Sequence, residues 1–156
     1  MNYIFSQKIE FHPDRQTIPN MSSALKFIKD NVQWSEYYIQ RIVYDQGVVN
    51  TPFIYEYNHD TKQMTMQKIP QMCIADMYGD KDTDIPLYLW KTIRDIFIKI
   101  RAIGINYPDI TPYNFIECGK QVWIIDFGHA SIRTKDTEEF MLKFIGGYNG
   151  WNPEYR

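Results

Sequence analysis

The sequence predicts an α+β fold with two lobes, because strand patterns occur early in the chain and the main helical patterns occur late. A first hairpin is predicted where segments 53–57 and 63–69 flank a short polar turn. A long amphipathic helix is predicted at 85–103, where apolar residues recur with the period of an α-helix. A second hairpin pattern surrounds Gly119. With 156 residues, the chain suits one domain or two small coupled lobes.

The N-terminal lobe is expected at 1–69 and should hold strands and one helix. Alternation of apolar and polar residues predicts a strand within 1–14 and a second short strand at 24–29. A helix should begin at Ser35, whose side chain can cap an N-terminus, and end at Gly47. The first hairpin then completes this lobe.

The C-terminal lobe is expected at 70–156 and should be mainly helical. Its long helix presents one apolar face and should end at Gly104, because glycine is the usual residue after a helix. In the second hairpin, 114–117 should pair with 122–125. A last helix is expected near 137–145.

Composition and charge exclude several classes of protein. Lys and Arg number 17 against 19 Asp and Glu, and this balance argues against a nucleic-acid partner, although aromatic side chains can stack on bases. The apolar runs are far shorter than the roughly 20 residues of a membrane span, so we expect no membrane partner. Cys73 and Cys118 lack metal-binding spacing and predict free thiols in a reducing compartment. We therefore expect a cytoplasmic protein.

Three polar side chains suggest phosphoryl chemistry. Asp109 and Asn114 stand five positions apart after the long helix, and Asp126 follows the strand that should pair with the one beginning at Asn114. The hairpin would therefore bring Asn114 and Asp126 together, and their oxygens suit Mg²⁺. Asp109 could orient a hydroxyl for in-line attack on a phosphoryl group. Gly128 would let the backbone turn sharply beside the metal.

These residues resemble the motifs of the protein kinase family. Asp109 matches the catalytic-loop aspartate, Asn114 matches the catalytic-loop asparagine, and Asp126-Phe127-Gly128 matches the DFG motif, in the same order and at similar separations. The resemblance extends over roughly 24–130. It implies an ATP- and Mg²⁺-dependent phosphotransferase acting on a hydroxyl of a protein or a small molecule. Asp109 would be catalytic, and Asn114 and Asp126 would hold the metal.

The resemblance also implies which residues contact the nucleotide. Lys26 is placed like the lysine that contacts the phosphates, with Lys29 as the alternative, and Glu36 is placed like the glutamate that pairs with it. Lys68 and Ile69 lie in a segment placed like the hinge, which holds adenine through backbone hydrogen bonds.

The chain also departs from the family pattern. No glycine precedes Gly47, so a glycine-rich phosphate loop is missing, and Tyr107-Pro108 replaces the usual His-Arg. Little of the chain follows Gly128. The implied fold therefore has a reduced N-lobe sheet and a truncated helical C-lobe, similar to atypical kinases and to small kinase-like proteins of large DNA viruses. A viral source would place the protein in the host cytoplasm. The same departures leave open a pseudokinase that senses nucleotide or binds a protein partner.

Overall fold

A computed structural model describes residues 25–155 of the chain. It has the mixed α+β composition that the sequence predicts. The strand expected within 1–14 lies outside the described residues. The short strand expected at 24–29 is present as β1 (Lys26–Lys29).

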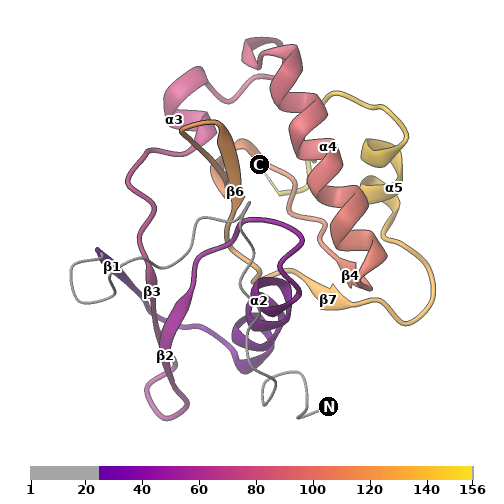
Figure 1. The fold of residues 1–156 in the computed structure, drawn as a ribbon. Coiled ribbons are helices and arrows are strands. Elements are labelled where there is room, and N and C mark those ends of the chain that lie inside the picture. Colours follow the sequence, from indigo (N-terminus) through magenta and orange to yellow (C-terminus); the bar gives the residue numbers. More distant parts are fainter. Residues whose placement is uncertain (1–24, 156) are drawn as a thin grey trace.

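The first hairpin and β1 form a three-stranded antiparallel sheet. The hairpin consists of β2 (Ile54–Asn58) and β3 (Gln63–Gln67), and β3 lies in the centre because β1 pairs with its other edge. The helix α2 (Trp34–Gln46) connects β1 to β2. Its N-cap is Gln33 and not the predicted Ser35, whereas Gly47 ends it as predicted, with a left-handed φ of 69°. Figure 1 shows this sheet at one side of the molecule.

The rest of the described chain is built around one long helix and the second hairpin. Figure 1 shows α4 and α5 packed side by side, away from the three-stranded sheet. Both predicted helices and the predicted hairpin are confirmed, while a short helix before α4 and a two-stranded ladder were not predicted. The elements are α3 (Ile74–Tyr78), the 3-10 turn η1 (Asp82–Asp84), α4 (Leu87–Ala102), β4 (Ile105–Asn106), η2 (Pro112–Asn114), β5 (Phe115–Cys118), β6 (Gln121–Ile124), β7 (Ser131–Ile132) and α5 (Glu139–Ile145). β5 pairs with β6, and β4 pairs with β7.

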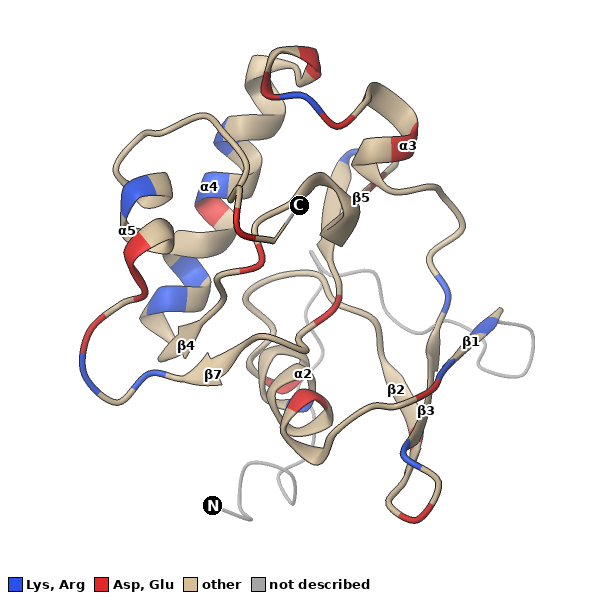
Figure 2. Cartoon of the chain, turned by 180° about the vertical axis from the view of Figure 1, so that it is seen from behind, with Lys and Arg blue, Asp and Glu red and all other residues tan. Residues whose placement is uncertain are grey.

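Charged residues of both signs are distributed over the ribbon. Figure 2 shows acidic and basic positions interspersed along α4, α5 and the connecting loops. The formal net charge of the chain is −2. Within residues 25–155, none of the helices combines the length and the apolar composition needed to cross a bilayer.

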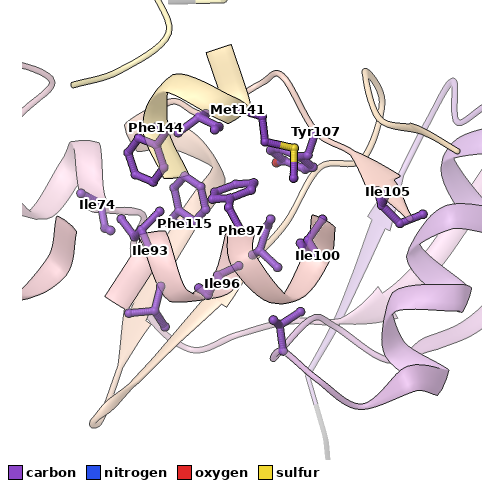
Figure 3. Close-up of a cluster of buried hydrophobic side chains, with 14 of the residues drawn as sticks. Ile74, Ile93, Ile96, Phe97, Ile100, Ile105, Tyr107, Phe115, Met141 and Phe144 are labelled. Carbon is purple, nitrogen blue, oxygen red and sulfur yellow. The ribbon is translucent and has the colours of Figure 1, made fainter. Parts of the chain in front are cut away.

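The main hydrophobic core lies between α4, α5 and the second hairpin. The apolar face of α4 supplies Ile93, Phe97 and Ile100, which are fully buried, and Figure 3 shows them gathered with side chains from β5 and α5. Trp151 also joins this core, so the segment after α5 packs against it. Two smaller clusters lie apart from it, one at the three-stranded sheet and one between the β3–α3 linker and the β5–β6 hairpin. The main core also includes Ile39 and Val43, so α2 packs against the helical part of the molecule.

Candidate active site

A single lysine lies between two carboxylates where β1, α2 and the segment after β6 meet. Nζ of Lys29 is 2.5 Å from Oε2 of Glu36 and 3.3 Å from Oδ1 of Asp126. The Glu36 side chain is only 8% exposed, while that of Lys29 is 27% exposed. Burial alone would lower the pKa of Lys29, but the hydrogen bond to Glu36 and the charges of Asp126 and Glu36 outweigh it and raise the pKa. The lysine therefore stays protonated and joins three elements.

The structure corrects the choice of lysine. Glu36 pairs with Lys29, and Nζ of Lys26 instead lies 4.6 Å from the centre of the Tyr55 ring. Side chains alternate between the two faces of a strand, so residues 26 and 29 of β1 point to opposite faces. Phe27 and Lys29 share the face that lines a cavity. The position of Lys26 on the other face explains why it does not reach Glu36.

The backbone at Asp126 has an unusual conformation that aims its carboxylate. Asp126 has a φ of 63°, a left-handed conformation that is uncommon for residues other than glycine. Its Oδ1 accepts a hydrogen bond from the backbone N–H of Gly128, 3.1 Å away, which stabilises this turn. A Cβ at Gly128 would lie 3.2 Å from Oδ1 of Asp126 and 3.4 Å from Oε1 of Glu36. Glycine at 128 thus keeps room beside both carboxylates.

Next to Lys29, a cavity of about 420 Å³ lies between the sheet and the β5–β6 hairpin. That volume is within the usual range for a small-molecule site. Its apolar wall includes Phe27, Met66, Ile69 and Ile116. Its polar lining includes Lys29, Lys68, Asn114 and Asp126. The lining of the cavity therefore combines apolar side chains with charged side chains of both signs.

Two residues of the predicted hinge line this cavity, but some of their backbone groups are already hydrogen-bonded. Lys68 and Ile69 follow β3 directly. The N–H of Lys68 donates to the carbonyl of Leu25 at 2.9 Å, and the carbonyl of Ile69 accepts from Gln71 at 2.8 Å. A nucleobase bound at this linker would therefore hydrogen-bond to the other backbone groups of Lys68 and Ile69.

Hydrogen bonds from Asn114 and Asn152 hold the loop that carries Asp109. Nδ2 of Asn114 donates to the carbonyl of Asp109 at 2.9 Å, which leaves the amide oxygen of Asn114 as the atom that could ligate a metal. The side-chain nitrogen of Asn152 donates to the carbonyl of Pro108 at 2.7 Å, and its backbone N–H donates to the carbonyl of Ile110 at 2.8 Å. Asn152 therefore holds the carbonyls on both sides of Asp109.

A buried tyrosine supports the strand end that leads to Asp126. Tyr107 is fully buried, and its hydroxyl donates to the carbonyl of Ile125 at 2.5 Å. Burial raises the pKa of Tyr107, and the charges of Asp126, Asp109 and Glu36 raise it further. Sequence reasoning treated Tyr107 only as a departure from a motif and did not find its contact, because no local pattern connects it to Ile125.

The donor set at Asn114 and Asp126 fits a hard divalent cation that keeps other oxygen ligands. Both residues line the cavity, and the backbone N–H of Ile125 donates to the carbonyl of Asn114 at 3.0 Å, which holds the two segments together. In the part of the chain that the structure describes, His, Cys, Asp and Glu do not form a group of three or more that could hold a metal. One carboxylate and one amide suit Mg²⁺, whose remaining places are usually taken by water and phosphate oxygens.

The structure places the residues inferred from the sequence in two groups, and Asp109 is not among the residues that line the cavity. Asp126, Glu36 and Gly128 surround Lys29, and Asn114 contacts the backbone of Asp109. In comparisons with known proteins, no protein-family model matches the chain and no curated protein is significantly similar to it.

Proposed function

We propose that this protein is a kinase-like, ATP- and Mg²⁺-dependent phosphotransferase. The observation that carries the proposal is the position of Lys29, which contacts Glu36 and Asp126 and lines the same cavity as Asn114. Two acids, an amide and one cation beside an apolar cavity are the groups that a nucleoside triphosphate with its metal would need.

In this proposal, different residues of the cavity contact the base and the phosphates of the nucleotide. The base lies against the apolar wall that includes Met66, Ile69 and Ile116, and the phosphates lie at Lys29. Asn114 and Asp126 would hold Mg²⁺, which when bound neutralises phosphate charge. Glu36 keeps the ammonium group of Lys29 in place, because it is the closer and more buried of the two carboxylates.

The transfer step is assigned to the loop at Asp109. Its carboxylate orients the acceptor hydroxyl, and the hydrogen bonds from Asn114 and Asn152 hold the loop in one conformation. Preorganised geometry of this kind is the main contribution that a protein makes to phosphoryl transfer. The acceptor is a hydroxyl of a protein or a small molecule.

The proposed architecture has two lobes that meet at the cavity. The N-lobe, 1–69, contributes the sheet and α2, and the C-lobe, 70–156, contributes α4 and the β5–β6 hairpin. A separate hydrophobic cluster at the sheet supports a distinct N-lobe, while Ile39 and Val43 of α2 pack into the main core and connect the two lobes.

Nucleotide binding is the first test, measured by calorimetry and thermal shift with ATP and Mg²⁺. We expect binding by the wild type, a loss of tenfold or more in Lys29→Met and Asp126→Asn, and near wild-type affinity in the matched variant Lys26→Met. Ligand at 100 times its dissociation constant should add about 2.7 kcal/mol to the free energy of unfolding. No binding of millimolar ATP by folded wild-type protein would contradict the proposal.

Phosphoryl transfer is the second test, measured as release of phosphate from γ-labelled ATP and as label transferred to candidate acceptors. Asp109→Asn should bind ATP normally and lose transfer. Transfer that survives this substitution would refute the role of Asp109.

A nucleotide-sensing or protein-binding pseudokinase is the alternative. It is favoured by the absence of glycine before Gly47, which removes the close backbone cover of the phosphates that a glycine-rich loop provides. Wild-type protein that binds ATP tightly, shows no turnover and retains a stable protein partner would support this alternative over the enzyme.

A further inference from the structure

The carboxylate of Asp109 is hydrogen-bonded to a histidine that is much more exposed than the aspartate itself. Nδ1 of His129 is 3.0 Å from Oδ2 of Asp109. The Asp109 side chain is 10% exposed and the His129 side chain is 58% exposed. The imidazole ring is therefore much more accessible than the carboxylate to a hydroxyl that approaches from solvent.

The hydrogen bond to Asp109 orients the ring of His129. A carboxylate oxygen accepts a hydrogen bond, so Nδ1 of the neutral ring carries the proton and Nε2 has the free electron pair. The same arrangement, a buried aspartate at one nitrogen and a reacting hydroxyl at the other, makes histidine a general base in hydrolases.

The C-terminal segment also contacts the ring of His129. The centres of the His129 and Tyr155 rings are 4.9 Å apart, with an angle of 57° between the ring planes. The N–H of Tyr155 donates to the carbonyl of Asn152, and Asn152 holds the carbonyls on both sides of Asp109. Asp109 and Tyr155 are thus attached to one hydrogen-bonded unit, and both contact the imidazole of His129.

We propose that His129 is the proton acceptor of the phosphotransfer reaction and that Asp109 acts through it, an inference that rests on the proposed function. The O–H bond of the acceptor breaks and its proton goes to Nε2 of His129. The acceptor oxygen forms a bond to the γ-phosphorus of ATP. The bond from that phosphorus to the bridging oxygen breaks, and its electron pair leaves with ADP. The imidazolium ring then gives its proton to water.

The experiment uses ATP hydrolysis with Mg²⁺, in which water is the acceptor hydroxyl. His129→Ala removes the ring, and His129→Gln retains a side-chain N–H for Asp109 but no basic nitrogen. Both variants should lower kcat about 100-fold or more, the usual contribution of a general base, and leave the Kd for ATP within twofold. Free imidazole should restore at least fivefold of the lost rate in His129→Ala and should not restore Asp109→Asn.

His59 provides the matched control. It is exposed in the turn of the β2–β3 hairpin, where its ring contacts the ring of Tyr57, and it has no part in the proposed reaction. His59→Ala and His59→Gln should keep the wild-type kcat and should not respond to imidazole.

Each outcome separates this inference from the function on which it rests. Wild-type turnover together with a fully active His129→Gln would overturn the role of His129 and leave the phosphotransferase intact. A His129→Ala variant that is faster than the wild type would mean that the ring blocks Asp109, and this would also overturn the role of His129. A slow His129→Ala variant that imidazole does not rescue would overturn that role as well. No turnover in the wild type would overturn the proposed function and this inference together.

Discussion

Replacement of Lys29 by methionine tests the ion pairs at the centre of the site. Methionine keeps most of the side-chain length and apolar area but removes the ammonium group. Glu36, which is almost completely buried, would then keep a carboxylate without its cation. We expect the substitution to lower the free energy of unfolding of the nucleotide-free protein.

The size of this loss follows from the exposure of the three side chains. Removal of one partner from a fully buried ion pair costs about 3–5 kcal/mol. The Lys29 side chain is 27% exposed, which reduces the cost, and the contact with the 40% exposed Asp126 adds at most about 1 kcal/mol. We therefore expect a loss of about 2 kcal/mol. Lys26→Met should cost less than about 1 kcal/mol, the usual size of an exposed cation–π contact such as that with Tyr55.

Urea unfolding of the single and double variants measures these values. Glu36→Gln should lose less than Lys29→Met, because Lys29 keeps Asp126 as a partner. The cycle with Lys29→Met/Glu36→Gln should give a coupling energy of about 1–2 kcal/mol. Equal losses in Lys26→Met and Lys29→Met, or a coupling energy near zero, would refute this account of the site.

Three further predictions concern the residues that support the loop and the core. Tyr107→Phe should cost about 1–3 kcal/mol in urea unfolding, because the buried carbonyl of Ile125 loses its donor. Because the pKa of Tyr107 is raised in the folded chain, the unfolded chain releases this proton near pH 10 while the folded chain keeps it. The free energy of unfolding should therefore be unaffected below pH 10 and fall above it, and it should fall less steeply in Tyr107→Phe. An alkaline slope that is the same in the variant and the wild type would contradict this prediction. Trp151→Ala should cost about 3–5 kcal/mol, and a loss under 1 kcal/mol would exclude Trp151 from the core. Asn152→Ala should lower kcat more than it raises the KM for ATP, and equal changes in both would argue against a positioning role for Asn152.

Much of the fold is predictable because it depends on local patterns. The helix α4 has a periodic apolar face over 16 residues, and both hairpins have turn residues between alternating segments. By contrast, α3 spans five residues and β4 and β7 span two residues each, which is too short for a period to be recognised. These short elements form because neighbouring segments pack against them.

The candidate site was partly predictable for a similar reason. Asp109, Asn114 and Asp126 belong to short motifs whose order and spacing are visible in the chain. The choice between Lys26 and Lys29 depends on which face of β1 turns to the cavity, and a strand of four residues with apolar side chains on both faces does not reveal it.

The sequence by itself determined the α+β class, the two hairpins, the long helix and the acid and amide residues of the motifs, because each follows from residues close together in the chain. Only the tertiary structure decided that Lys29 meets Glu36 and Asp126, that His129 meets Asp109 and that Asn152 holds the loop. Apart from the pair of Lys29 and Glu36, which are seven positions apart, these contacts join residues 20, 44 and 97 positions apart, and such separations are closed by packing of the whole core and not by any local preference.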